Sequence, residues 1–188
     1  LVSALLGGWM GLNQTQTRKL MAFSSIAHMG WLMVALTITP SLTTMTLLMY
    51  FILTTTMFMI LALTESKTTL DLSAPHAYGP TLMVLLMLST VSLGGLPPLP
   101  GFFPKWLILK ELTYLHMPLV ATIMALSTLP SLYFYIRMTY IMMLTSPPNT
   151  PSTQHKWRLL TNPPTTTTTL SALAILLLPL TPTLMNST

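Results

Sequence analysis

The sequence predicts an all-α fold, a polytopic bundle of transmembrane helices in which one helix is broken. Only 6% of the 188 residues are charged and 52% are hydrophobic, whereas about a quarter of the residues in a soluble domain are charged. Apolar segments long enough to cross a bilayer alternate with short polar or proline-containing stretches. One longer apolar segment contains GGLPPLPGFFP, which cannot continue a regular helix.

The expected crossings belong to a single membrane domain over residues 1–188. We expect a partial helix over residues 1–9 and complete helices over 20–36, 42–63, 119–144 and 168–185. The segment 81–114 is too long for one straight helix, and its glycines and prolines break it at 94–104. The chain begins inside an apolar stretch without an initiator Met or a signal peptide, so we interpret the sequence as partial.

The segment 81–114 could form two crossings or one broken crossing, and the charge distribution favours one. Lys and Arg accumulate in short loops on the cytoplasm-like side of a membrane. With one crossing, the basic stretches around Arg18, Lys67 and Lys156 all fall on the same face. With two crossings, Lys156 would lie opposite Lys67. We therefore predict one partial and five further crossings.

Composition excludes several classes of function. The chain has no cysteine, so disulfides, thiolate metal sites and cysteine nucleophiles are ruled out. The eight basic residues give a formal charge of +5, but they are scattered, which argues against a nucleic-acid partner and fits a lipid bilayer. His76, His116 and His155 have no second ligand at metal-binding spacing. Because no GxGxxG, P-loop or haem motif is present, we expect this chain to bind no nucleotide or redox cofactor.

Lys105 is the first candidate for a functional residue. An ionisable group at the centre of a bilayer costs about 2.5 to 3.5 kcal/mol or more, so each one suggests a functional site. Pro104 suits the first position of the second half-helix, with Lys105 directly after it. The positive end of that half-helix and poor hydration both disfavour the ammonium form, as a proton relay requires. The alternative is a lysine that only snorkels to the interface.

His28 is the second candidate. It follows Lys19 by nine residues, which places it roughly 13 Å deeper in the same helix. Ser24 and Ser25 precede it by four and three residues, so one or both hydroxyls share the face of the imidazole and could pass protons. The alternative is a histidine that only bonds a neighbouring helix.

Three other charged residues lie in or next to the predicted crossings. Lys19 either anchors the end of its helix or feeds protons toward His28. Glu111 follows Lys105 on the second half-helix and is a weak candidate for its partner, since only one of the adjacent residues Lys110 and Glu111 can share the face of Lys105. Arg137 lies well inside an apolar segment, where it either balances a carboxylate or snorkels.

Two long motifs carry a resemblance to a known family. The stretches GGWMGLNQTQTRKLMAFSSIAHMGW and SLGGLPPLPGFFPKW, together with LYFYIR at 132–137, resemble the antiporter-like membrane subunits of respiratory complex I, the NADH:ubiquinone oxidoreductase of mitochondria. The resemblance covers nearly the whole chain and is weak only in the loops and the Thr-rich end. The chain departs from the family pattern at Phe23 and Pro100, where tyrosine and threonine are common.

The resemblance implies a fold, a function and roles for individual residues. The fold is that of the complex I antiporter-like subunits, with two inverted five-helix repeats that each contain a broken helix. Lys105 and His28 match proton-channel positions of the family, and Lys19 matches its RK pair. The implied function is that of a core membrane subunit of a proton-translocating NADH:ubiquinone reductase in the mitochondrial inner membrane, in contact with other complex I membrane subunits.

In such a complex, NADH, FMN, iron–sulfur clusters and ubiquinone would be held elsewhere, and this chain would contain no redox site. Two alternatives remain open. One is a stand-alone cation/proton antiporter of the related Mrp type. The other is a structural subunit whose polar groups serve assembly and which has no proton path of its own.

Overall fold

A computed structural model describes residues 1–64, 66–72, 80–144 and 165–187. In this part of the chain all regular elements are helices: α1 (Val2–Gly11), α2 (Thr17–Ile38), α3 (Pro40–Thr64), α4 (Pro80–Gly94), α5 (Phe102–Tyr114), α6 (Pro118–Leu144) and α7 (Thr165–Ser187). The expected spans at 1–9, 20–36, 42–63, 119–144 and 168–185 each fall within one of these helices or beside its first residue.

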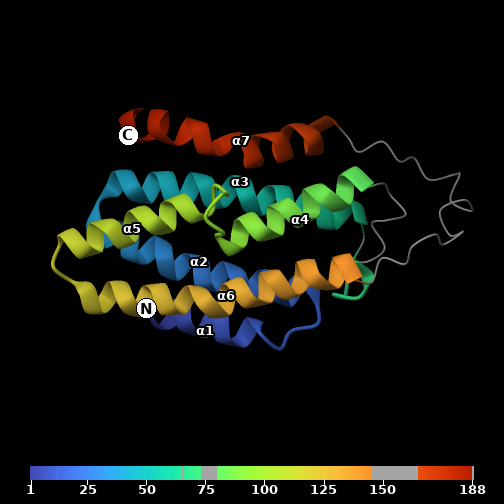
Figure 1. Ribbon diagram of the computed structural model, residues 1–188, viewed down its shortest axis with the longest axis horizontal. Helices are drawn as coiled ribbons and strands as arrows, with labels where there is room; N and C mark the ends of the chain where they lie inside the picture. Colours follow the sequence, from blue (N-terminus) through green and yellow to red (C-terminus); the bar gives the residue numbers. More distant parts are fainter. Residues whose placement is uncertain (65, 73–79, 145–164, 188) are drawn as a thin grey trace, which may run out of the picture.

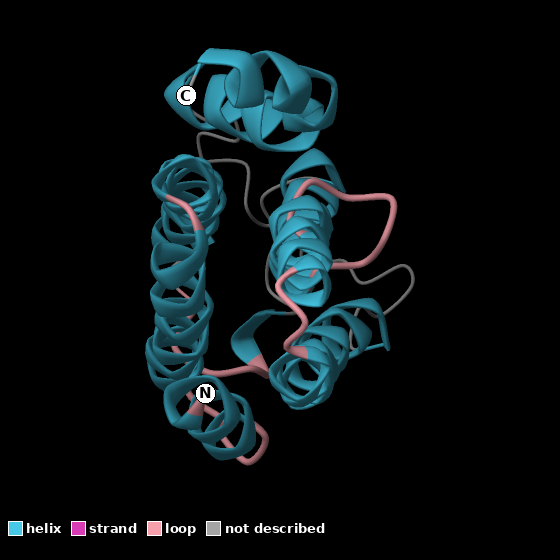
Figure 2. Ribbon diagram, turned by 90° about the vertical axis from the view of Figure 1, so that its left-hand side faces the viewer, coloured by secondary structure: helices cyan, strands magenta, loops and turns pink. Residues whose placement is uncertain are grey.

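The helices run along a common direction (Figure 1). Helices α4 and α5 follow one another along the bundle, and α6 packs against both of them. Helix α2 lies between α1 and α3, while α7 covers α3 and α4. Seen along the bundle, α7 occupies one edge and the N-terminal helix the opposite edge (Figure 2). The middle of the bundle, where α4 gives way to α5, is therefore enclosed by α2, α3 and α6.

Proline defines where several helices begin. Helices α3, α4 and α6 start with Pro40, Pro80 and Pro118. A proline is well suited to the first position of a helix because its φ is already helical and the missing N–H has no partner there. Pro130 is different, since it lies inside α6. A Cβ built on Gly8 of α1 would lie 3.1 Å from the Cβ of Pro130, so α1 packs closely against α6 at this point.

The broken helix ends and restarts within a few residues. Helix α4 ends at Gly94, and Gly95 has a φ of +86°, a left-handed conformation that glycine adopts without strain. The Gly95 N–H donates to the carbonyls of Val91 at 3.2 Å and Ser92 at 3.0 Å, which closes the last turn of α4. The chain then turns and begins α5 at Phe102.

The expectation that Pro104 is the first residue of the second half-helix is wrong. Helix α5 begins two residues earlier, at Phe102, and the N–H of Phe102 donates to the Leu99 carbonyl at 3.1 Å. The physical reason is that the N–H groups in the first turn of a helix have no intrahelical acceptor. A proline is therefore tolerated at the third position as well as at the first.

Contacts at one end of the bundle hold two basic residues together. The Thr17 N–H donates to the Lys67 carbonyl at 3.1 Å, and the Thr17 hydroxyl donates to the Ser66 carbonyl at 3.0 Å. Arg18, the next residue of α2, therefore lies at the same end as Lys67. In the same loop the Thr68 N–H donates to the Asp71 carboxylate at 2.8 Å, which lowers the pKa of that carboxyl.

Lys156, used in the charge argument, and His76 and His155, considered as metal ligands, lie outside the described residues. The placement of the basic stretch around Lys156 therefore stays a prediction.

Among the residues that the structure describes, three helices are long and apolar enough to cross a membrane, namely α2, α3 and α6. Shorter apolar helices cover Val2–Gly11, Thr81–Gly94 and Thr165–Leu176. Large apolar side chains such as Met33, Phe51 and Leu119 are exposed on the outside of the bundle. Many serine and threonine hydroxyls donate to a carbonyl of their own helix: Thr56, for example, donates to the Leu53 carbonyl at 2.7 Å, as hydroxyls in membrane helices commonly do. This pattern of apolar outside and self-satisfied hydroxyls is typical of a bundle in lipid.

Candidate functional site

Lys105 is buried in the first turn of α5, and its side chain reaches back across the break. Its exposed fraction is 8%. Its Nζ donates to the carbonyl oxygen of Gly94, the last residue of α4, at 3.2 Å. Gly95 lies against the same side chain, because a Cβ built on it would be 3.1 Å from Nζ. The lysine therefore links the two half-helices.

The hydrogen bond gives Lys105 a partner that the sequence argument did not include. From the sequence, the expected influences on the amine are the positive end of α5, poor hydration and, weakly, Glu111. The structure directs the amine to the opposite, negative end of the other half-helix, where α4 presents its terminal carbonyls. A buried amine needs such an acceptor. The backbone of the break supplies it.

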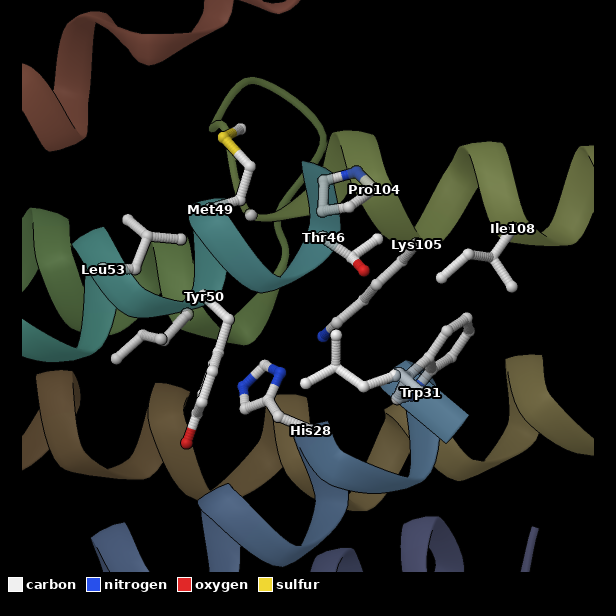
Figure 3. A pocket seen from close by; sticks show the side chains of 12 residues that line it. His28, Trp31, Thr46, Met49, Tyr50, Leu53, Pro104, Lys105 and Ile108 are labelled. Atoms are coloured by element: carbon white, nitrogen blue, oxygen red, sulfur yellow. The ribbon is translucent and has the colours of Figure 1, made fainter. Parts of the chain in front are cut away.

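His28 lies about halfway along α2 and faces Lys105 from the other side of the site. Figure 3 shows the amine of Lys105 directed from α5 toward the imidazole. The imidazole also contacts the ring of Tyr50 on α3, with centroids 4.9 Å apart and planes tilted by 37°. The Tyr50 hydroxyl points away from Lys105 (Figure 3) and lies beside the hydroxyl of Ser25.

A cavity of about 40 Å³, which we call the main cavity, lies between α2, α3 and α5. Most of its walls are apolar, and its polar side chains are His28, Thr46, Tyr50 and Lys105. The remaining walls are formed by Trp31, Leu32, Met49, Leu53, Leu93, Gly101, Pro104 and Ile108. The two relay candidates, which are far apart in the sequence, thus share one cavity.

A second, smaller cavity of about 10 Å³ lies between α2, α5 and α6, and we call it the hydroxyl cavity. His28 and Lys105 line it as well. The other side chains are Ser24, Ala27, Trp31, Ser127, Ser131, Phe134 and Tyr135. The spacing of the two serines before His28 predicts one or both of them on its face, and Ser24 does line this cavity with the imidazole.

The structure does not bring the remaining charged candidates to these cavities. Lys19 is exposed in the first turn of α2 and lines neither of them. Glu111 is half-buried, lies farther along α5 and also lines neither cavity. Lys110 is exposed and lies over the ring of Tyr114, 5.5 Å from its centroid.

Arg137 has a structural partner. Its guanidinium donates to the Leu12 carbonyl at the end of α1, at 2.8 Å. This backbone acceptor was not among the two alternatives that the sequence left open for Arg137, a carboxylate partner and snorkelling, and the choice between those two stays open. Among the described residues, no three His, Asp or Glu side chains gather in a way that could hold a metal ion.

Tyr50 and Tyr135 are site residues that the sequence analysis missed. Each belongs to a helix that is apolar on most sides, where a tyrosine resembles ordinary core packing. The available signal was weak: a tyrosine within a membrane span needs a partner for its hydroxyl. For Tyr135, the neighbouring Ser131 one turn earlier could have marked a polar face of α6.

The fold and the site define a class of protein. A membrane helix broken in its middle, with a buried lysine at the break and a histidine facing it, is the arrangement expected for antiporter-like membrane subunits. Residues 1–131 match the family described as NADH:quinone oxidoreductase/Mrp antiporter, transmembrane, and the chain belongs to this family. Residues 132–185 match the family NADH dehydrogenase subunit 2 C-terminus.

Among curated proteins, the chain is similar to the C-terminal portion of NADH-ubiquinone oxidoreductase chain 2. The chain is 47% identical to that protein from Polypterus ornatipinnis, over 99% of the chain and 54% of the relative. It is 50% identical to the Salmo salar protein, over 97% of the chain and 52% of the relative. The chain thus spans about half the length of the curated relatives it matches. The resemblance to complex I subunits predicted from the motifs is confirmed.

A solved structure confirms the predicted fold class. The chain matches a chain in the structure of respiratory complex I from Thermus thermophilus with bound aureothin, with a TM-score of 0.72 and 26% identity. The match covers 95% of this chain and 43% of the other. The all-helical bundle is therefore that of a complex I membrane subunit.

Proposed function

We propose that this chain carries part of a proton-translocation path in a core membrane subunit of NADH:ubiquinone oxidoreductase. It would act in the mitochondrial inner membrane, as a multi-pass chain in contact with lipid and with other membrane subunits of complex I. The redox chemistry of NADH, FMN, iron–sulfur clusters and ubiquinone would take place elsewhere in the complex. The family match and the chain 2 relatives support this assignment.

The observation that carries the proposal is the pairing of Lys105 with His28. Both side chains line the same two cavities, at the level where α4 gives way to α5. Burying an ionisable group in a bilayer is costly, so two of them at one place require a function that offsets the cost. Unwound backbone at this depth is tolerated where it lines a cavity, as it does here.

In this function the two residues exchange one proton. The Lys105 ammonium releases a proton, which reaches the neutral imidazole of His28, so the positive charge moves from α5 to α2. The Gly94 carbonyl holds the amine at the break in the process. Lys19, exposed at the start of the same helix as His28, would exchange protons with the aqueous side. We give Glu111 only a weak role as a distant counter-charge.

Lys105→Met in assembled complex I tests the proposal. The substitution keeps most of the side-chain volume and removes the titrating group, so we expect a lower proton-to-electron ratio at measurable NADH oxidation. Lys110→Met is the matched control, because it removes an exposed lysine from the same helix, and it should leave the ratio unchanged. A normal ratio in Lys105→Met would refute the relay role.

The same experiment separates the alternative functions. If the chain were a structural subunit, Lys105→Met would reduce the amount of assembled complex but leave the proton-to-electron ratio of the remaining complex intact. If it belonged to a stand-alone Mrp-type antiporter, it would purify without redox subunits. The match of residues 132–185 to NADH dehydrogenase subunit 2 favours a complex I subunit over a stand-alone antiporter.

A further inference from the structure

We propose that the hydroxyl cavity is a water-binding site, and that Tyr135 of α6 orients its water between Lys105 and His28. The binding site stands on the structure alone. The part that the water plays in proton transfer rests on the proposed function.

The hydroxyl of Tyr135 is the first reason. Tyr135 is among the most deeply buried side chains, with 1% of its surface exposed. Its hydroxyl lies near that of Ser24 but makes no hydrogen bond of normal geometry. Because buried polar groups in proteins are nearly always paired with protein or with ordered water, an unpaired phenol that lines a cavity indicates a water molecule.

The serines supply the complementary groups. Ser24, Ser127 and Ser131 each donate their hydroxyl hydrogen to a carbonyl three residues earlier in their own helix, at 2.7, 2.7 and 2.8 Å. Their oxygens therefore remain free to accept. A water in this cavity can accept a hydrogen bond from Tyr135 or Lys105 and donate to the serine oxygens. Two to four polar partners are what a buried water requires.

The volumes and linings of the two cavities also favour the hydroxyl cavity as the site of an ordered water. The hydroxyl cavity, at about 10 Å³, is close to the smallest space that holds one water molecule. The main cavity is larger, at about 40 Å³, but its walls are mostly apolar. A buried water is ordered best where it finds two to four polar partners close together. The firmly bound water therefore belongs in the hydroxyl cavity.

Both relay residues line this cavity, so its water can pass a proton between them. An N–H bond of the Lys105 ammonium breaks as an O–H bond forms on the water oxygen. A different O–H bond of the water breaks as an N–H bond forms on the imidazole of His28. Lys105 becomes a neutral amine, His28 becomes an imidazolium, and the water is regenerated. Tyr135 is a positioning residue that fixes the orientation of the water.

Tyr135→Phe in assembled complex I tests the inference, because it removes the hydroxyl and keeps the packed ring. Tyr133→Phe is the matched control, an exposed tyrosine on the same helix. Two quantities are measured: water density in high-resolution cryo-electron microscopy maps and the proton-to-electron ratio. We expect wild type and Tyr133→Phe to show a water within hydrogen-bond distance of the Tyr135 hydroxyl and of a serine oxygen. Tyr135→Phe should lose this water and show a lower ratio.

Three results would overturn the inference or part of it. A wild-type map with ordered water elsewhere in the bundle but none in this cavity would refute the binding site. Loss of the water in Tyr135→Phe with an unchanged ratio would refute the role in proton transfer. If Lys105→Met had a normal ratio while the water was present, the proposed function would fail and the binding site would stand. Ser131→Ala, which removes one acceptor, serves as the second variant if Tyr135→Phe does not assemble.

Discussion

At the scale of single residues, His28 is held by a neighbour on another helix. The imidazole packs on the ring of Tyr50 at a centroid distance of 4.9 Å. Tilted aromatic pairs of this kind are worth about 0.5–1.5 kcal/mol beyond the area that they bury. The ring, more than the phenol hydroxyl, therefore fixes the imidazole in the two cavities, because the hydroxyl points away from Lys105 (Figure 3).

Tyr50→Leu should lower the proton-to-electron ratio, because it removes the ring that positions His28. Tyr50→Phe keeps the ring and should retain most of the wild-type ratio. Phe51→Leu removes an exposed aromatic ring from the next position and is the control for general effects on α3. If Tyr50→Leu acts through the imidazole, it should have no further effect in a His28→Gln background. An additional loss in the double variant would contradict this role.

The sequence predicted Lys105 and His28 as candidates but not their environment. Both could be found because an ionisable side chain is conspicuous in an apolar segment. Their partners could not, because a helix that is apolar on nearly every side gives no periodicity that tells which residues face which neighbour. Tyr50, Tyr135 and the Gly94 carbonyl depend on how helices pack, and a backbone acceptor leaves no trace in residue types.

At the scale of the helices, small residues bring α1 and α2 into close contact. A Cβ built on Gly7 would lie 2.6 Å from the backbone nitrogen of Ala27, and one built on Gly30 would lie 2.7 Å from that of Ala4. Membrane helices use such pairs because lipid provides no hydrophobic driving force between them, and close packing must supply the attraction. This contact sets the position of the helix that carries His28.

Gly30→Val should separate α1 from α2 and destabilise the bundle. Overpacking a tight contact costs about 1–3 kcal/mol. We expect a lower unfolding temperature of the detergent-purified complex and less assembled protein. Ala22→Val makes a β-branched residue at an exposed position of the same helix and should have little effect. Equal stability of the two variants would show that the contact between these helices is not tight.

The break between α4 and α5 depends on the conformation of one glycine. Gly95→Ala places a Cβ in a left-handed conformation, which costs about 1–2 kcal/mol, and brings it 3.1 Å from Lys105 Nζ. We expect lower thermal stability and a lower proton-to-electron ratio. At Gly94 a Cβ meets only ordinary contacts with Tyr135, the nearest at 3.4 Å, so Gly94→Ala is the control. A Gly95→Ala complex as stable and active as that control would contradict this account.

The elements themselves were more predictable than the site. Apolar segments of membrane length and the run of glycine and proline are properties of the sequence alone, so helices and a break could both be expected. The exact residue at which the second half-helix begins, Phe102, could not be predicted, because a proline fits several positions of a first turn.

At the scale of the whole molecule, the single broken crossing remains a prediction about topology, which the absence of cysteine makes testable. Single cysteines at Lys67 and Leu115, both exposed, can be labelled with an impermeant maleimide in inner-membrane vesicles of known orientation. One broken crossing predicts labelling from opposite faces, because α4 and α5 together cross the bilayer once. Labelling of both positions from the same face would mean that the segment crosses twice.

The hydroxyls that bond within their own helices also affect how the bundle can move. Serines and threonines such as Thr56 and Ser127 use their hydrogen inside one helix, so the surfaces between helices carry few polar links. Two links between side chains and another helix end stand out, Lys105 to Gly94 and Arg137 to Leu12. In mechanical terms, these two hydrogen bonds are fixed points at which a displacement of one helix is passed to another. One of these hydrogen bonds is made by Lys105, the proposed proton carrier, so a shift of α4 relative to α5 moves the acceptor of its amine.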